Sequence, residues 1–188
     1  EALSKELGVE KEVLKAVAEV ESRGKGFINL NGERKAKILY ERHYMYRQLA
    51  KKKSNKYDLN KLSQENPNIV NKLAQPRGTY GTEEHQYEKL AIAKNIDNDS
   101  AIQSCSWGKF QVMGSYYSYG GYVTPTEFEE AMHLCELQQF VYFKNFLSKV
   151  SPGIIKPMRD KNWAMIAEIY NGPDYRSGSY DTKMKNAY

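Results

Sequence analysis

Hydrophobic residues recur at helical spacing along most of the chain. From Val13 to Val20 they fall three or four positions apart, which predicts a helix from about Glu10 to Arg23, preceded by a short helix that breaks at Gly8. The residues that follow, Gly24-Lys25-Gly26, tolerate left-handed backbone and end this helix. The same spacing predicts further helices over Arg42–Lys52, Glu83–Lys94, Trp107–Met113, Thr126–Val150 and Asn162–Tyr170.

Alternating strand patterns are nearly absent. Residues 35–40 (KAKILY) fit a short strand or an extended entry to the next helix. We therefore predict a mainly α fold with at most a small β element near residues 35–41.

Two polar segments interrupt the helical pattern. Residues 54–81 are rich in Asn, Pro, Gln and Gly, which predicts a long surface loop with one short helix near Gln64–Leu73; loops of this length often cover a cleft. Residues 114–122 form a second loop, rich in Gly and Tyr. Neither segment resembles a flexible linker, so we predict a single domain over residues 1–188. The chain begins without methionine and enters a helical pattern at once, which suggests that it was trimmed from a longer chain.

The chain is basic, with 28 Lys and Arg against 23 Asp and Glu and a net charge of +5. Lysines gather at Lys51-Lys52-Lys53, with Lys56 and Lys61 close behind. A basic surface favours anionic partners such as nucleic acid or a phosphate-rich bacterial envelope, although this run taken alone fits a solvated helix end better. No apolar run approaches the roughly 18 residues of a membrane span, and the N-terminus has no hydrophobic signal region. We expect no stable membrane insertion and no signal peptide in this chain.

Two other functional classes fit poorly. The opening resembles a DNA-binding helix-turn-helix, but glutamates at Glu10, Glu12, Glu19 and Glu21 would repel phosphate, so no nucleic-acid partner is expected. A zinc enzyme would need grouped ligands, and only His133 and Cys135 are close in sequence. We predict no metal and no cofactor. Cys105 and Cys135 fit small buried residues better than partners in a disulfide.

Glu21 is the leading candidate for a catalytic carboxyl. It follows Leu14 by seven residues and Val17 by four, which places it on the apolar face of its helix. A carboxyl held against hydrophobic side chains has a raised pKa, as a general acid near neutral pH requires. A glutamate at a helix end that turns to water, or pairs with Arg23 or Lys25, fits the spacing equally well.

Glycoside cleavage commonly uses a second carboxylate, and Glu41 is the leading candidate for it. It lies where the apolar run Ile38-Leu39-Tyr40 meets the helix that begins at Arg42. A cap on that helix, or a buried pair with Arg42 or His43, explains Glu41 slightly better from the sequence alone. Weaker candidates are Asp97, Asp99 and Glu168.

Four motifs occur in order along the chain: Glu21 to Phe27 (ESRGKGF), Leu39 to His43 (LYERH), Ser106 to Gly114 (SWGKFQVMG) and Tyr170 to Gly172 (YNG). Together they resemble the N-acetylmuramidase domain of bacteriophage endolysins, and the resemblance extends from about Val9 to the C-terminus. More distantly, they are similar to goose-type lysozymes and lytic transglycosylases.

This resemblance implies a lysozyme-like helical fold and hydrolysis of the β-1,4 bond between N-acetylmuramic acid and N-acetylglucosamine, with Glu21 as the catalytic acid. It implies peptidoglycan as the partner of a protein made in the bacterial cytoplasm and acting on the cell wall, and we expect a monomer. Two alternatives stay open: a lytic transglycosylase that forms 1,6-anhydro ends, and a module that binds peptidoglycan without cutting it.

The motifs also supply candidate substrate-binding residues. Gly108 permits close approach of backbone or ligand, and Gln111 offers a donor and an acceptor to an acetamido group, whereas Phe110 fits packing better. The polar ends of Tyr170 and Asn171 fit a cleft, and a helix cap explains Asn171 almost as well. Tyrosines offer flat apolar faces to sugars. The full set of candidates is Ser106, Gly108, Gln111, Tyr116, Tyr117, Tyr170 and Asn171.

Overall fold

The computed structural model describes residues 2–52 and 56–188, so Lys53 of the basic run and the start of the predicted 54–81 loop lie outside the described residues. The mainly α prediction is confirmed, with 62% helix and 9% strand. None of the helices in the described ranges combines the length and the apolar character needed to cross a bilayer.

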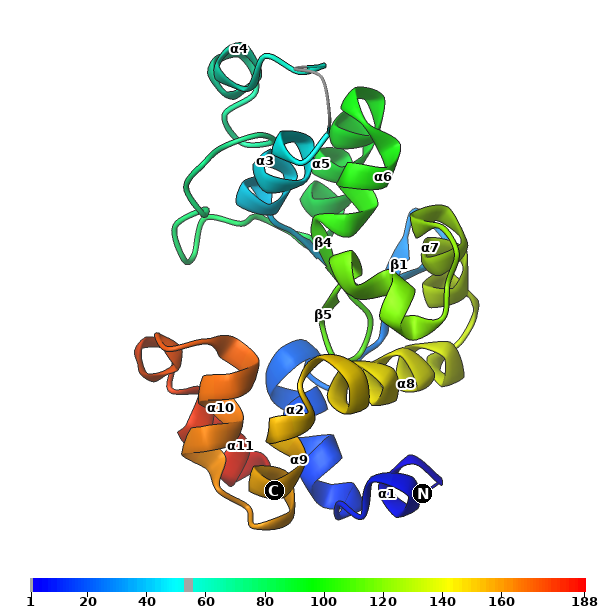
Figure 1. Ribbon diagram of the computed structural model, residues 1–188, viewed down its shortest axis with the longest axis vertical. Helices are drawn as coiled ribbons and strands as arrows, with labels where there is room; N and C mark the ends of the chain where they lie inside the picture. The colour runs from blue at the N-terminus through cyan, green and yellow to red at the C-terminus, as the bar shows by residue number, and fades with distance from the viewer. Residues whose placement is uncertain (1, 53–55) are drawn as a thin grey trace.

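The helices form two groups with a small sheet between them (Figure 1). The upper group in that view contains α3 (Arg42–Ala50), α4 (Leu59–Glu65), α5 (Glu83–Ile96) and α6 (Asn98–Gln103). The lower group contains α1 (Ala2–Leu7), α2 (Lys11–Ser22), α8 (Glu136–Asn145), α9 (Ile155–Arg159), α10 (Trp163–Asn171) and α11 (Tyr180–Ala187). Helix α7 (Pro125–Leu134) lies to one side, next to β1 in the view (Figure 1).

Helix α2 lies in the lower group with one face buried and the other exposed to solvent. Its residues Val13, Leu14, Val17 and Ala18 are buried, which agrees with the predicted apolar face. The helix ends because Arg23 adopts left-handed backbone, with φ 57°, and the amide of Gly24 donates back to the carbonyl of Ala18. This arrangement is a Schellman-type end, and it fixes the last helical turn, which carries Glu21.

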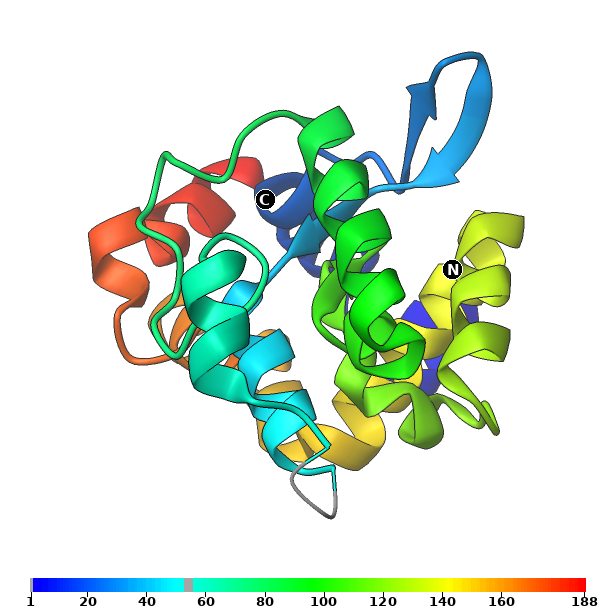
Figure 2. The ribbon, with the colours of Figure 1, turned by 90° about the horizontal axis from the view of Figure 1, so that it is seen from above.

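Two small antiparallel sheets give the fold more β structure than the predicted element near residues 35–41. Strands β1 (Phe27–Leu30) and β2 (Glu33–Ala36) form a hairpin that projects from the body of the protein (Figure 2). Strand β3 (Ile38–Tyr40) pairs with β4 (Cys105–Trp107), which pairs with β5 (Val112–Met113). The predicted strand at 35–40 is therefore divided between the two sheets.

The predicted helix at residues 107–113 is wrong. Gly108 has φ 70° and Gln111 has φ 50°, so the chain turns sharply between β4 and β5 instead of continuing as a helix. The predicted loop at 114–122 contains a 3₁₀ helix, η1 (Gly114–Gly120). The short helix predicted near residues 64–73 lies earlier, at α4, because Asp58 caps its first turn by accepting a hydrogen bond from the amide of Lys61.

The predicted helix at 126–150 is broken at Cys135, whose extended backbone has φ −163° and ψ 164°. Helix α8 follows, and a π-helical turn, η2 (Phe146–Val150), ends the segment. The buried side chain of Gln139 on α8 stabilises this break. Its Oε1 accepts from the backbone amide of Lys109, and its Nε2 donates to the carbonyls of Gly26 and Met132. One side chain thereby joins α7, α8 and the β4–β5 turn.

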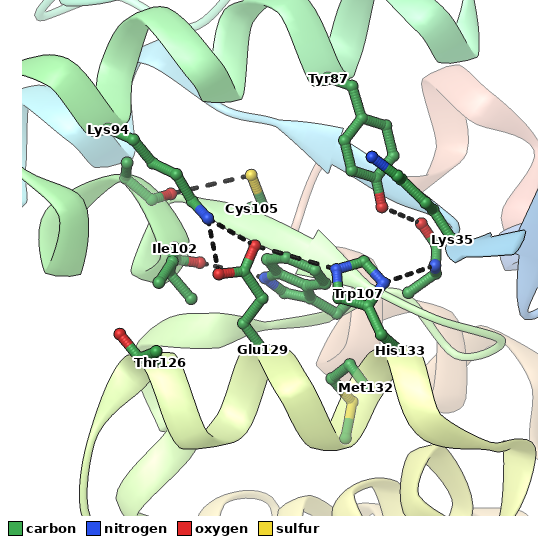
Figure 3. Close-up of polar contacts among 12 residues, drawn as sticks. Lys35, Tyr87, Lys94, Ile102, Cys105, Trp107, Thr126, Glu129, Met132 and His133 are labelled. Atoms are coloured by element: carbon green, nitrogen blue, oxygen red, sulfur yellow. Dashed lines mark hydrogen bonds and ion pairs between the residues drawn. The ribbon is translucent and has the colours of Figure 1, made fainter. Parts of the chain in front are cut away.

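A polar network holds α5, α7 and the hairpin together (Figure 3). Lys94 of α5 donates to both carboxylate oxygens of Glu129 on α7, at 2.8 and 2.6 Å. His133, one turn further along α7, accepts from the amide of Ala36 through Nδ1, and Tyr87 donates to the carbonyl of Ala36. These contacts fix the end of β2 to α5 and α7, close to Trp107 of the three-stranded sheet.

Candidate active site

A cleft of about 350 Å³ opens between the two groups of helices. Its floor is a row of neighbouring residues across the three-stranded sheet, because Leu39 pairs with Ser106 and Ser106 pairs with Met113. Their neighbours on β4, Cys105 and Trp107, are fully buried, so the alternation of the strand sends Ser106 toward the cleft. The remaining lining residues come from α2, α3, α10, α11 and the segments beside them: Val20, Glu21, Glu41, His43, Tyr44, Gln111, Tyr170, Asn171 and Tyr180.

Glu21 enters the cleft from the last turn of α2. Ser22, the next residue, anchors this turn, because its hydroxyl donates to the carbonyl of Lys109 at 2.7 Å. Asn171 Nδ2, at the end of α10, donates to Glu21 Oε1 at 2.8 Å. Glu21 makes no ion pair with Arg23 or Lys25 within the part of the chain that the structure describes. The carboxyl is thus held in one orientation by a neutral partner.

Burial raises the pKa of Glu21 from its ordinary value of 4.5 to about 7, and the hydrogen bond from Asn171 opposes this rise. An ionised carboxylate loses water in this position and gains no nearby cation in return, so the protonated form is favoured. The sequence predicted a raised pKa from the apolar face of α2, and the structure has the same direction and cause. Such a carboxyl can donate a proton near neutral pH.

The β4–β5 turn supports the floor beside Glu21. Gln111 donates through Nε2 to the carbonyls of Lys37 and Gly108, at 3.3 and 2.9 Å, and its Oε1 accepts from Ser106 at 3.0 Å. Most of its amide is therefore used inside the protein, although Gln111 lines the cleft. Gly108 does not line it; a Cβ there would lie 2.5 Å from Cδ of Gln139, so the group that approaches Gly108 closely is a side chain of α8.

Glu41 lies at the N-terminal boundary of α3 but does not cap it, since its side chain makes no hydrogen bond to the first turn. Tyr80 instead donates its hydroxyl to Glu41 Oε2 at 2.9 Å, and His43 Nδ1 lies 3.3 Å from the same oxygen. The buried pair with His43 that the sequence offered as an alternative is present. Arg42 turns away and binds loop carbonyls, including those of Pro67 and Leu73.

Two buried polar atoms on the cleft residues have no hydrogen-bond partner among the described residues. They are Asn171 Oδ1 on the wall formed by α10 and His43 Nδ1 on the wall formed by α3, whose contact with Glu41 Oε2 at 3.3 Å is an ion-pair distance without hydrogen-bond geometry. Buried polar atoms are nearly always paired in folded proteins. Both atoms are therefore polar positions on the cleft residues that the described protein groups leave unsatisfied.

Some predicted residues lie outside the cleft lining. Tyr116 and Tyr117 of η1 are half-buried and pack against the core, and Tyr116 lies 5.5 Å from the ring of Phe146. Their contact with substrate stays a prediction. Asp97 caps α6 and accepts from Tyr57, while Phe110 stacks on Phe143 at 3.8 Å, as packing predicted.

The sequence reasoning missed Tyr44, Tyr80 and Tyr180. Tyr180 on α11 is half-buried, and burial raises its pKa, with further contributions from Glu21 and Glu41. Tyr80 lies in the polar segment that was predicted only as a surface loop. Tyr44 and Tyr180 line the cleft, and Tyr80 contacts it through Glu41; no motif marked any of the three in the sequence.

A group of three or more His, Cys, Asp or Glu side chains placed to hold a metal ion does not occur in residues 2–52 and 56–188. His133 and Cys135, the pair considered above, have other surroundings: His133 binds the backbone of β2, and Cys135 is a free thiol between α7 and α8.

The helical fold and its cleft define the class of lysozyme-type glycoside hydrolases. The model of the N-acetylmuramidase family matches residues 10–188, and the chain belongs to this family. It is similar to the crystal structure of the Burkholderia AP3 phage endolysin, with 35% sequence identity and a TM-score of 0.82 over 99% of this chain and 67% of that chain. A search of curated proteins gave no significant match. The chain is thus a peptidoglycan hydrolase of the lysozyme type.

Proposed function

We propose that the protein hydrolyses the β-1,4 bond between N-acetylmuramic acid and N-acetylglucosamine, with Glu21 as the general acid. The observation that carries this proposal is the position of Glu21 in the cleft with a pKa raised to about 7 by burial. Glycoside hydrolases need a carboxyl that remains protonated at working pH so that it can protonate the leaving oxygen.

Asn171 selects which oxygen of Glu21 carries the proton. Because Asn171 Nδ2 donates to Oε1, that oxygen acts as an acceptor, and the proton belongs on Oε2. Oε2 then donates to the bridging oxygen of the glycan as the bond to the sugar breaks. The carboxylate that forms is stabilised by the same hydrogen bond, which lowers the pKa of Glu21 during the step in which it loses its proton.

Glu41 is the second carboxylate in this proposal. It lies in the same cleft as Glu21 and is oriented by Tyr80 and His43. A carboxylate there activates the water that attacks the sugar, or stabilises the positive charge that develops on it. Ser106, Gln111, Tyr170 and Asn171 contribute the surface on which the sugars bind. One chain carries both carboxylates, so we expect the protein to act on the cell wall as a monomer.

The test compares Glu21→Gln with Glu19→Gln on isolated peptidoglycan, with mass spectrometry of the products. Glu19 lies on the same helix but is exposed to solvent, which makes it a matched control. We expect Glu21→Gln to lower the rate at least about a hundredfold, as the loss of a general acid does, and Glu19→Gln to leave it unchanged. Glu41→Gln should lower the rate as well.

The products distinguish this proposal from its alternatives. Hydrolysis by water leaves reducing N-acetylmuramic acid ends, whereas a lytic transglycosylase leaves 1,6-anhydro ends. A binding module would release no fragments with any variant, while still sedimenting with the wall. Anhydro products alone, or wild-type activity of Glu21→Gln, would each overturn the proposal.

A further inference from the structure

Lys89 on α5 is a buried lysine that the proposed reaction does not use directly. Its relative exposure is 1%, and its Nζ donates to the carbonyl of Tyr80 at 2.9 Å. No carboxylate oxygen lies within ion-pair distance of this ammonium among the described residues. Burying an ammonium with so few partners costs free energy, and an apolar side chain of similar shape would avoid that cost.

The contacts of Lys89 lead to the cleft through one residue. Tyr80 receives two hydrogen bonds at its carbonyl, from Lys89 Nζ and from Gln86 Nε2 at 2.7 Å. Its ring lies 5.5 Å from Lys89 Nζ, and its hydroxyl donates to Glu41 Oε2. The loop residue Tyr80 is therefore held by α5 through its carbonyl and binds Glu41 through its hydroxyl.

The charges around Glu41 and Lys89 come from several elements. Glu41 opposes the fall in the pKa of Lys89 that burial causes, while Arg42 adds to that fall. Lys89 and Glu41 thus carry opposite charges and are joined through Tyr80, which binds both of them. The titratable groups that face these two residues are His43 and Tyr44 on α3, Arg42 beside them, Tyr80 in the loop, Cys105 on β4 and Tyr180 on α11.

We propose that Lys89 is a positioning residue for the reaction, which fixes Tyr80 against Glu41 and places a positive charge behind that carboxylate. Glu41 then keeps one orientation in the cleft, set by the hydroxyl of Tyr80. This inference rests on the proposed role of Glu41, and it adds the contacts that hold this carboxylate in place.

The test uses Lys89→Met, which removes the charge and keeps the length of the side chain. The melting temperature should remain the same or rise, because a buried charge is lost. The maximal rate should fall about three- to tenfold while the KM stays nearly unchanged, because Glu41 loses its fixed orientation. Tyr80→Phe removes the hydrogen bond to Glu41 and should have the same effect.

Lys94→Met is the matched control on the same helix. Lys94 pairs with Glu129 of α7 (Figure 3) and does not line the cleft, so its loss should lower the melting temperature and leave the maximal rate unchanged. Lys89 would have only a structural role if Lys89→Met behaved like Lys94→Met, or lost stability while keeping the maximal rate. Either result overturns the inference.

A double-mutant cycle on melting temperature separates this inference from the role of Glu41. Glu41→Gln should lower the melting temperature more in the Lys89 protein than in Lys89→Met, since only the former has the charge interaction. Additive effects would overturn the inference while leaving Glu41 as the second carboxylate. Full activity of Glu41→Gln would overturn the proposed role of Glu41, and with it the role of Lys89 in catalysis.

Discussion

The stability of the protein should depend on pH through Glu21. Burial raises its pKa from 4.5 to about 7, so the folded chain holds this proton more tightly than the unfolded chain. The contribution to stability is therefore fully present below pH 4.5 and is lost as the pH rises through about 7. At about 1.4 kcal/mol per pH unit between the two pKa values, the loss reaches about 3 kcal/mol. Because Glu21 is half-buried and faces the cleft, solvent screens part of this effect, and we expect the loss of stability to be about 2–3 kcal/mol.

Glu21→Gln removes this dependence and keeps the acceptor for Asn171. The variant should be more stable than the wild type at pH 8 by about 2–3 kcal/mol, which raises the melting temperature by roughly 4–10 °C in a chain of this size. At pH 4 the two proteins should be nearly equal. Urea unfolding at several pH values measures the difference, with Glu19→Gln as the control. A difference that stays constant between pH 4 and 8 would refute the reasoning.

Two further predictions concern the hydrogen bond to Glu21 and the β4–β5 turn. Asn171→Ala removes a hydrogen bond that lowers the pKa of Glu21, so the alkaline limb of the pH–rate profile should move to higher pH; an unmoved limb would mean that Glu21 does not control it. Gly108→Ala introduces a Cβ at φ 70° and 2.5 Å from Gln139 Cδ, so it should destabilise the fold by about 2 kcal/mol or more, measured by urea unfolding. Unchanged stability would show that Gln139 can move aside.

Helical spacing predicted the parts of the fold whose core contacts are local. In α2 the apolar positions from Val13 to Ala18 are buried as the pattern indicates, and Glu21 lies on the same side of the helix, half-buried in the cleft. The 107–113 segment has a similar density of apolar residues but folds into strands, because Gly108 and Gln111 adopt left-handed backbone. A pattern of hydrophobic positions does not reveal such angles, and the pairing partner of β4 lies far away in β3.

The candidate site was likewise predictable from the sequence only in part. Glu21 and Asn171 belong to recognisable motifs, and the bond between them joins residues 150 positions apart that only the folded chain brings together. Tyr80 and Lys89 carry no motif, since their arrangement depends on how the polar loop packs on α5. Glu41 was placed at the correct junction, yet the loop tyrosine that binds it was not predictable from sequence.

The C-terminal segment has a consequence for the time at which the site forms during synthesis. Asn171 and Tyr180 line the cleft opposite Glu21, which is translated well before them, and Arg159 binds the carbonyl of Leu7 across 152 positions. The cleft therefore has no complete wall until α10 and α11 have been translated and have docked. We expect a chain that is interrupted before α10 to lack the hydrogen bond to Glu21 and, with it, the complete site.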